Sequence, residues 1–358
     1  MFDSEFDFAQ DYDMVLKVSE HSNKISHVSK CLYYQRNFKS DKKNASPDEK
    51  IRMLENHFLR QNVSATVSPQ KNDCFKIDYA ISGNPLVSIL IPTCDHWQML
   101  KKCIDSLEKS TWENYEIILI ENNSKESETF AFYDSLKSNP KIKQLYWKGE
   151  FNFSAINNFA VSHANGEYIV LLNNDTEVIS PNWIEEMLMF AQRKDVGAVG
   201  AKLYFPNGKI QHGGDIYANE PNHTFFKFPV DSNGYENRLT VVQNYSMVTA
   251  ACMMISRKVY DSMSGLNENF AVGYNDVDMC LRIRKAGYQI VWTPYAELYH
   301  KESESRGGHD NIECKIRAKA ENFLLKNYHG DKFVDPFYNP NLNQWATDFS
   351  VTGDIFPE

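Results

Sequence analysis

Strand-like and helix-like segments alternate along the chain from Leu86 onward, and this alternation constrains the fold more than any other feature. Short segments rich in Val, Ile, Leu and Tyr predict buried strands, and the segments between them have the apolar spacing of helices that bury one face. Strands are expected at 86–91, 115–121, 142–148 and 168–173, and helices at 97–110, 126–138, 154–164 and 181–194. This order predicts an α/β fold in which helices flank a central, mostly parallel sheet.

The pattern changes after Val196. This second half of the chain predicts mixed strands and long loops, with a stretch rich in Gly, Asn and Pro that extends to about residue 245 and a strand-like segment at 250–256. Loops carried on a rigid sheet are the usual place for a substrate-facing surface, so substrate selectivity is expected to lie here.

The composition excludes several classes of protein. Lysine and arginine number 38 against 47 aspartates and glutamates, a net charge of −9, and no basic block occurs, so a broad nucleic-acid-binding surface is not expected. The apolar segments are far shorter than the ~20 residues that span a bilayer, and the acidic N-terminus differs from a signal peptide. The seven cysteines include no CxxC pair, which fits a reducing compartment. We therefore expect a cytoplasmic protein.

One sequence pattern occurs twice. DYDMVLKV starts at Asp11 and DVDMCLRI at Asp276. Each copy is followed by a predicted aliphatic strand with tyrosine near its end, at 25–34 and 290–300. A duplicated module explains both copies. The alternative is a chance likeness of two unrelated amphipathic helices.

Polar residues that directly follow predicted strands are the first site candidates, because ligands of open α/β sheets bind beyond the carboxyl ends of the strands. Neither GxGxxG nor GxxxxGK[ST] occurs, so the dinucleotide fingerprint and the P-loop are excluded. Carboxylates and amides can instead bind a base and a ribose. The candidates are Thr93, Asp95, Glu121, Asn122, Asn173, Asn174 and Asp175.

The segment LLNNDTEV (171–178) gives the sharpest signal for a metal. A buried strand there leads into two amides and the carboxylate of Asp175, and Mg²⁺ or Mn²⁺ binds such oxygen atoms together with phosphate oxygens. The cation would offset the charge of a departing diphosphate. The same residues are common in turns and N-caps, so a purely structural role for Asp175 stays open.

Three further candidates lie in 273–307. Asp276 lies at the start of a predicted helix. It is a candidate base, and the alternative is that it only caps the helix. His300 lies at the end of a predicted strand. It is a candidate metal ligand through its neutral imidazole, and the alternative is a hydrogen-bonded core histidine. Arg306, beside glycine, is a candidate bidentate phosphate ligand or a solvated surface arginine.

Five segments together carry a resemblance to a known family: VSILIPTCD (87–95), IILIENNS (117–124), FNFSAINNFAVSHANGEYIVLLNNDTEV (151–178), GYNDVDMCLRIRKAGYQIVWTPYAELYHKESESRG (273–307) and DPFYNPNLN (335–343). In this order they resemble family 2 glycosyltransferases with the GT-A fold, a Rossmann-like fold of nucleotide-diphospho-sugar transferases. The likeness is greatest to the bacterial rhamnosyltransferase-like members that build O-antigen and other surface polysaccharides.

The resemblance also implies a domain organisation. It implies a GT-A glycosyltransferase domain at 85–345 and a C-terminal tail at 346–358. Residues 1–40 resemble the C-terminal remnant of an upstream glycosyltransferase-like module, and 41–84 form a linker with a helix and a strand.

The resemblance implies a role for each candidate residue. Asp276 matches the catalytic base, although Asn275 replaces the glutamate that precedes it in the family. Asp175 matches the metal-binding carboxylate of the DxD motif, whose first acid is here Asn173, and His300 matches the C-terminal metal ligand. The residues implied in nucleotide-sugar binding are Pro92, Thr93, Asp95, Glu121, Asn152, Asn157, Asn174, Asp175 and Arg306.

The activity implied is an inverting glycosyl transfer that depends on Mg²⁺ or Mn²⁺. The first donor expected is dTDP-rhamnose, with UDP-hexoses next. The acceptor is a saccharide or a lipid-linked saccharide, which would bring the protein to the inner face of the plasma membrane, and no nucleic acid partner is expected. Two alternatives stay open: a non-catalytic saccharide-binding or scaffolding remnant of a tandem transferase, and a nucleotidyltransferase, although IPTCDHWQ lacks the glycine-rich basic loop usual in the latter.

Overall fold

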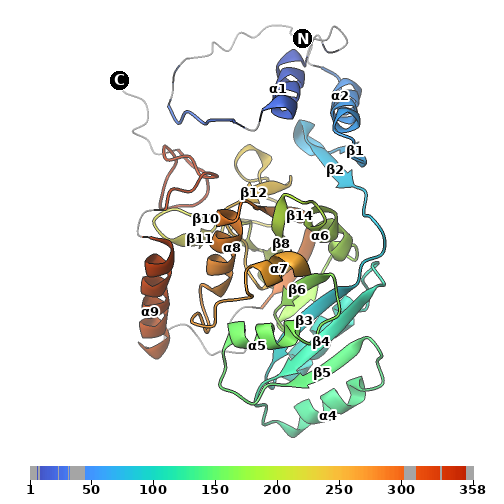
Figure 1. The fold of residues 1–358 in the computed structure, drawn as a ribbon, viewed down its shortest axis with the longest axis vertical. Helices are drawn as coiled ribbons and strands as arrows, with labels where there is room; N and C mark the ends of the chain where they lie inside the picture. Colours follow the sequence, from blue (N-terminus) through green and yellow to red (C-terminus); the bar gives the residue numbers. More distant parts are fainter. Residues whose placement is uncertain are drawn as a thin grey trace. The chain divides into compact units, whose positions relative to one another are not determined.

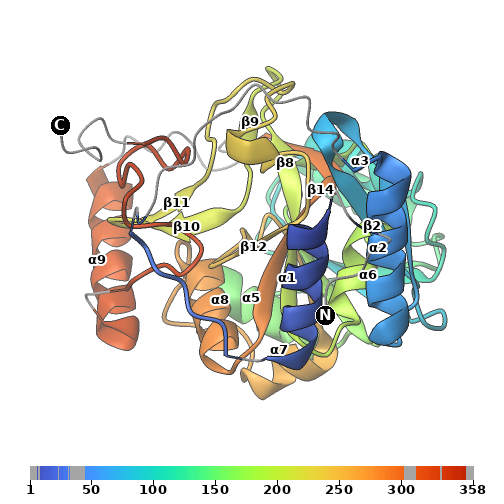
Figure 2. The ribbon, with the colours of Figure 1, turned by 90° about the horizontal axis from the view of Figure 1, so that it is seen from above.

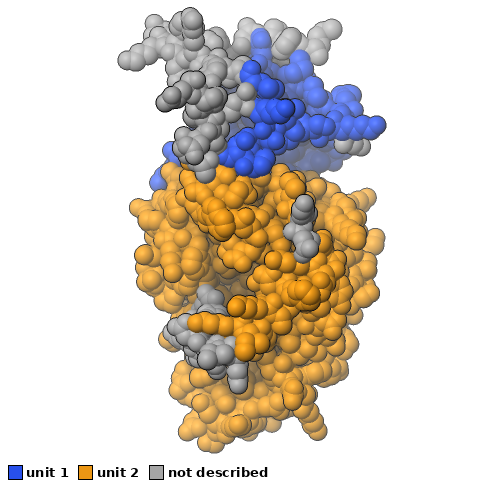
Figure 3. Space-filling model, turned by 90° about the vertical axis from the view of Figure 1, so that its left-hand side faces the viewer, with its two compact units in different colours: residues 1–80, 339–341, 353–358 blue, residues 81–338, 342–352 orange. Residues whose placement is uncertain are grey.

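The computed structural model describes residues 6, 9–22, 24–30, 32, 45–301, 312–330 and 333–351. The chain forms two compact units, which Figure 3 distinguishes by colour. The smaller unit consists of residues 1–80 with 339–341 and 353–358, and the larger of residues 81–338 with 342–352. All of the candidate site residues fall in the larger unit.

The described residues of the smaller unit form two α-helices, a short 3₁₀ helix and a hairpin. Its elements are α1 (Gln10–His21), α2 (Pro47–Arg60), β1 (Ala65–Pro69), the short 3₁₀ helix η2 (Lys71–Asp73) and β2 (Phe75–Tyr79), with β1 and β2 antiparallel. Helix α2 starts with a capping box, in which Ser46 Oγ accepts from the Glu49 N–H and the Glu49 carboxylate accepts from the Ser46 N–H. Two backbone donors that the first turn leaves without helical partners are thereby satisfied.

Glu20 joins α1 to α2. Its Oε1 lies 2.7 Å from His57 Nδ1 and 2.6 Å from Arg60 Nη2, and the carboxylate is 3% exposed. The hydrogen bond from Arg60 outweighs burial and holds the pKa of Glu20 at about 2. The ion pair therefore stabilises the contact between the two helices.

The described residues of the larger unit build a ten-stranded sheet with the order β12-β14-β8-β13-β6-β3-β4-β5, to which β7 adds beside β14 and β9 beside β8 (Figure 1). Strands β5, β4, β3 and β6 are parallel, β13 is antiparallel to β6 and β8, and β14 is parallel to β8. Their bounds are β3 (Val87–Thr93), β4 (Tyr115–Glu121), β5 (Ile142–Tyr146), β6 (Tyr168–Leu172), β7 (Thr176–Val178), β8 (Val196–Tyr204), β9 (Ile210–His212), β12 (Gln243–Tyr245), β13 (Cys252–Ser256) and β14 (Gln289–His300).

Helices cover both faces of this sheet. Helices α5 (Phe153–Val161), α7 (Arg257–Ser262) and α8 (Asn275–Lys285) bury one set of alternate strand residues, such as Leu90 and Leu171. Helices α3 (Trp97–Leu107) and α6 (Trp183–Ala191) cover the other face, where Met187 meets Cys252. The remaining elements are α4 (Ser127–Leu136), the antiparallel hairpin β10 (Asp215–Tyr217) and β11 (Pro221–His223), the 3₁₀ helix η3 (Tyr235–Asn237) and α9 (Ile312–His329).

Helix α9 lies outside α8 (Figure 2). Its buried Glu321 accepts the backbone N–H groups of Val272 and Gly273 just before α8, at 3.0 and 3.1 Å. Near its C-terminal end, His329 Nε2 lies 2.8 Å from Asp278 Oδ1 of α8. Helix α9 therefore fixes both the entry to α8 and its first turn.

The structure confirms the expected α/β fold with a central sheet flanked by helices. The prediction of a strand at 25–34 is wrong for its described part, because residues 25–30 do not form a strand. The corresponding segment of the second copy, β14, is held by hydrogen bonds to β8 and β12. A strand-like segment without a neighbouring strand has no partner for its backbone groups, so an apolar pattern alone does not make a strand.

The two copies of the repeated pattern do form equivalent helices. Asp13 and Lys17 of α1 make an i,i+4 ion pair of 2.6 Å, and Asp278 and Arg282 occupy the same positions of the pattern in α8 with a separation of 2.8 Å. Both aspartates are buried. No helix in the described part of the chain has the length and apolar character needed to cross a membrane.

We predict that Glu20→Gln destabilises the smaller unit by about 1.5–3 kcal/mol, the usual contribution of hydrogen bonds to a charged group. Hydrogen exchange at pH 7 should speed up in α1 and α2. Because the pKa of Glu20 is lowered, its stabilisation is present above the unfolded value of ~4.3 and is lost as the pH falls toward 2. Glu55→Gln, at an exposed site on α2, is the control, and equal exchange in both variants would contradict the role of Glu20.

Candidate active site

The carboxyl ends of parallel strands β3, β4 and β6 form the edge at which the candidate site lies. The register sets Thr93 of β3 beside Glu121 of β4, and Pro92 directly precedes Thr93 on β3. After β6, Asn174 Nδ2 donates to Thr93 Oγ1 at 3.3 Å. Thr93, Glu121 and Asp175 are buried. The structure thus brings residues from three strand ends into one polar edge, as their positions in the sequence predict.

Two of the predicted nucleotide-binding carboxylates also hold the loop that follows β4. Asp95 has a left-handed backbone (φ 48°), and its Oδ1 accepts the N–H groups of Lys125 and Glu126 at 2.7 and 2.9 Å. Glu121 accepts the backbone N–H of Ser124 through Oε1. A carboxylate has about four acceptor positions, so both groups keep capacity for a ligand beyond these bonds.

Asn152 and Asn157 lie on a different element, α5. Asn152 is its N-cap, with Oδ1 accepting from the Ala155 N–H at 3.0 Å and Nδ2 donating to the Glu268 carbonyl at 2.8 Å. Asn157 is fully buried and donates to the Phe153 carbonyl at 2.8 Å. Its role as the N-cap is therefore enough to explain Asn152, and no bound ligand is needed for that explanation. Arg306 lies outside the described residues.

Asp175 and His300 meet because β7 pairs with β14. That pairing sets Thr176 opposite His300 and brings Asp175 Oδ1 to 3.2 Å from His300 Nε2. Asn173 Nδ2 lies 3.1 Å from the same nitrogen. Asp175 and His300 are 6% and 8% exposed. An oxygen donor from the turn before β7 and a nitrogen donor from the end of β14 therefore converge at the edge of the sheet.

Gln211 sets the orientation of the His300 ring. Its Oε1 lies 2.7 Å from His300 Nδ1, and an amide oxygen only accepts, so Nδ1 carries the ring proton and Nε2 keeps a lone pair, which accepts from Asn173 Nδ2. Metal-binding histidines are held in this way by a partner at the other ring nitrogen. The donor set and its orientation fit a divalent cation. Our sequence analysis missed Gln211, because nothing in its local pattern indicates that β9 pairs with β8 and thereby brings Gln211 to His300 of β14.

Asp276 lies in the first turn of α8. Its Oδ2 accepts the Ala250 N–H at 3.0 Å, and its Oδ1 accepts the Val277 N–H at 2.9 Å. Burial raises the pKa of Asp276, the negative charge of Asp215 adds to the increase, and the hydrogen bond from Ala250 opposes it. A raised pKa suits a carboxylate that takes up a proton. The N-cap of the helix is Tyr274, in a left-handed conformation, so Asp276 is not the capping residue, although it accepts one N–H of the first turn.

We predict that Gln211→Leu weakens Mn²⁺ binding by about 10–100-fold, the usual cost of removing the partner of a metal-binding histidine. The reason is that His300 loses the acceptor that fixes its tautomer. Titration followed by electron paramagnetic resonance of free Mn²⁺ measures the affinity, with Asp175→Ala as the reference for loss of a donor. Gln192→Leu, whose amide bonds the backbone of Ser82, is the matched control. Equal affinities of the Gln211 and Gln192 variants would argue against the role of Gln211.

Comparisons with known proteins show which families and structures this chain is similar to. Residues 88–263 match the family described as Glycosyl transferase family 2. The chain is 39% identical to the uncharacterized protein y4gI of Sinorhizobium fredii (strain NBRC 101917 / NGR234), over 98% of this chain and 40% of that protein. It is 35% identical to the O-antigen biosynthesis protein RfbC of Myxococcus xanthus, over 96% of this chain and 27% of that protein. The chain thus spans less than half the length of these relatives.

Solved structures show the same fold. The mannosyltransferase PcManGT of Pyrobaculum calidifontis, in complex with GDP-Man and Mn²⁺, superimposes with a TM-score of 0.54 at 16% identity, over 75% of this chain and 72% of that one. GalNAc-T7 with UDP, GalNAc and Mn²⁺ gives a TM-score of 0.53 at 14% identity, over 71% of this chain and 51% of that one. At these identities the likeness establishes the GT-A type of fold.

Proposed function

Because this chain carries a family 2 glycosyltransferase domain, we propose that it transfers a sugar from a nucleotide donor to a saccharide hydroxyl with inversion at the anomeric carbon. One observation carries the proposal: Asp175 and His300 converge at the strand edge that also bears Thr93 and Glu121. The relative RfbC, an O-antigen biosynthesis protein, supports a role in bacterial surface polysaccharide synthesis, and dTDP-rhamnose is our first choice of donor.

The strand ends would bind the donor. Thr93, Glu121 and Asn174 present hydroxyl, carboxylate and amide groups to the nucleotide, and Asp95 holds the loop that lines this edge. Asp175 and His300 Nε2 would hold the divalent cation. When bound, Mg²⁺ or Mn²⁺ supplies positive charge where the diphosphate departs. Both structural neighbours were solved with Mn²⁺, which supports this assignment.

Asp276 would act as the base on the acceptor. It removes the proton of the acceptor hydroxyl as that oxygen bonds to the anomeric carbon, while the bond from this carbon to the diphosphate breaks on the opposite face. The proton stays on Asp276 and the electron pair leaves with the diphosphate. A single displacement needs no enzymic nucleophile. The backbone N–H groups of Ala250 and Val277 hold the carboxylate in one orientation throughout.

We further propose that residues 1–40 derive from an upstream module of the same type. The support is the equivalence of α1 and α8, in which the same pattern gives a buried aspartate paired with a basic residue one turn later. The strand that follows the second copy, β14, pairs with a sheet, whereas the described residues that follow the first copy, 25–30, form no strand. The catalytic site of this chain is then built by the larger unit alone.

We expect Asp276→Asn to lower kcat by at least ~10²-fold, the lower end of acid–base catalysis, while donor binding is retained. The amide keeps the size of the side chain but does not take up the proton. Transfer is measured with nucleotide sugars and Mn²⁺, and donor binding by thermal shift. Asp11→Asn, the equivalent position of the repeated pattern in α1, is the matched control because Asp11 is exposed.

Full transfer by Asp276→Asn would remove Asp276 from this role. Absence of both transfer and donor hydrolysis in the unmodified chain, with donor binding intact, would instead favour a non-catalytic saccharide-binding module. Release of pyrophosphate rather than a nucleoside diphosphate would point to nucleotidyl transfer.

The pH dependence of kcat/KM should report Asp276 in the free protein. Since burial raises its pKa, kcat/KM is expected to fall as the pH is lowered through a value above the ~3.9 of an ordinary aspartate. The titratable groups that interact with Asp276 are Asp215, His212, His223 and Cys280. In Asp276→Asn this limb of the profile should disappear, and its persistence would assign the titration to another group.

A further inference from the structure

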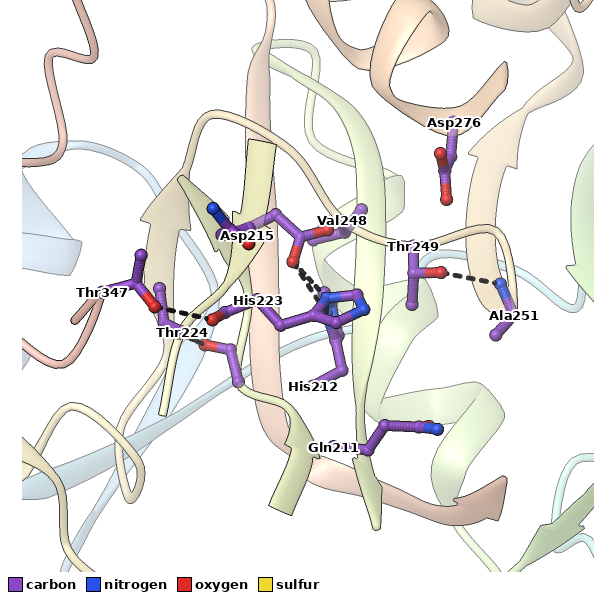
Figure 4. Close-up of polar contacts among 12 residues, drawn as sticks. Gln211, His212, Asp215, His223, Thr224, Val248, Thr249, Ala251, Asp276 and Thr347 are labelled. Atoms are coloured by element: carbon purple, nitrogen blue, oxygen red, sulfur yellow. Dashed lines mark hydrogen bonds and ion pairs between the residues drawn. The ribbon is translucent and has the colours of Figure 1, made fainter. Parts of the chain in front are cut away.

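A second convergence of donor atoms lies in the larger unit, formed by His212, Asp215 and His223 (Figure 4). His223 Nδ1 is 2.5 Å from Asp215 Oδ1 and 3.0 Å from His212 Nδ1. His212 Nδ1 is 3.2 Å from the same aspartate oxygen. Three side chains thus direct one donor atom each toward a common point. None of the predicted site residues belongs to this cluster, although the charges of Asp215 and His223 act on the pKa of the nearby Asp276.

The backbone holds the cluster in place. Asp215 and His223 are directly opposite each other in the β10–β11 hairpin. His212 is brought back to Asp215 by Gly213 and Gly214, and Gly214 has a φ of 94°. A Cβ at position 214 would lie 2.1 Å from the Tyr245 ring, so both the conformation and the space require glycine there. The three donors are therefore fixed before any ligand binds.

Hydrogen bonds alone do not satisfy this arrangement. Three close contacts join the three donor atoms, but the two Nδ1 atoms supply at most two hydrogens, and placing both leaves two N–H groups facing each other. His212 is 0% exposed, and its Nε2 has no hydrogen-bond partner among the described residues. A buried polar atom without a partner costs about 1–3 kcal/mol. The polar contacts that this ring does make in the cluster are those of its Nδ1. One cation between the three atoms would satisfy all of them.

We propose that His212 Nδ1, Asp215 Oδ1 and His223 Nδ1 bind a divalent transition-metal cation, with Zn²⁺ the best fit, at a site separate from Asp175 and His300. Two imidazoles and one carboxylate are a zinc donor set that leaves the fourth position open. Donor atoms on one tetrahedral zinc are about 3.3 Å apart, so two of the three separations already match and the third opens by about 0.8 Å. The His223 side chain is 36% exposed, which gives the ion and a fourth ligand a path from solvent.

The site would clamp the segment that orients Asp276. Asp215 forms a two-way backbone bridge with Met247, at 3.0 and 3.2 Å, and three residues later the Ala250 N–H donates to Asp276. Strand β9 also links this cluster to the first donor pair, since Gln211 bonds His300 and the next residue is His212. A cation here would stiffen the frame of the catalytic edge without contacting the substrate.

Co²⁺ titration of the full chain after removal of metal by a chelator tests the proposal. The double variant Asp175→Ala, His300→Ala silences the other candidate site. In that background we expect one Co²⁺ per chain with the intense visible bands of tetrahedral coordination. Adding His223→Ala should weaken binding by at least ~100-fold, more than loss of a mere partner of a ligand. His163→Ala, a partly buried histidine just after α5, is the control.

Two further measurements separate loss of the site from misfolding and identify the ligands. Circular dichroism of the metal-free proteins must be the same in all variants, and His223→Gln replaces His223→Ala if the latter does not fold. X-ray absorption of the zinc-loaded background should show two imidazole ligands near 2.0 Å. No Co²⁺ bound in the background, or binding unchanged by either His223 variant, would overturn the proposal whether or not the chain transfers sugar.

Discussion

The pairing of β7 with β14 is the constraint on which the candidate active site depends. It joins the segment just after β6 to the end of a strand more than a hundred residues later, and so brings Asp175 to His300. Strand β14 is itself fixed by parallel pairing with β8, and β9 along β8 brings Gln211 to the other side of the His300 ring. Each donor is thus held by strand pairing, which is more rigid than a loop.

Burying polar groups at this edge is costly, and the structure offsets the cost with backbone donors. Asp276 receives two N–H groups, as does Asp95, and Glu121 receives one. Such bonds restrict each carboxylate to one orientation while leaving acceptor positions for a ligand. The same bonds oppose the rise in the pKa of Asp276 that burial causes, so the group stays able to ionise.

The two copies of the repeated pattern separate local from tertiary effects. In α1 and α8 the pattern gives a helix with the same ion pair one turn apart. Only in α8 does the first aspartate reach a buried polar edge, where Ala250 donates to it; Asp11 in α1 is exposed. The helix is therefore a property of the local sequence, and the chemistry of its first aspartate is a property of the surrounding sheet.

The sequence by itself determined the alternation of strands and helices, since periodic apolar residues at 86–194 bury one face whatever the remaining chain does. It also indicated Thr93, Glu121 and Asp175, because each lies at or shortly after the carboxyl end of a strand whose direction the crossover helices fix. Only the tertiary structure decided the position of β9, the part played by Gln211 and the meeting of His212, Asp215 and His223. Those contacts depend on strand pairing and on a glycine turn packed against Tyr245, and such long-range pairing leaves no periodic mark on the residues that it joins.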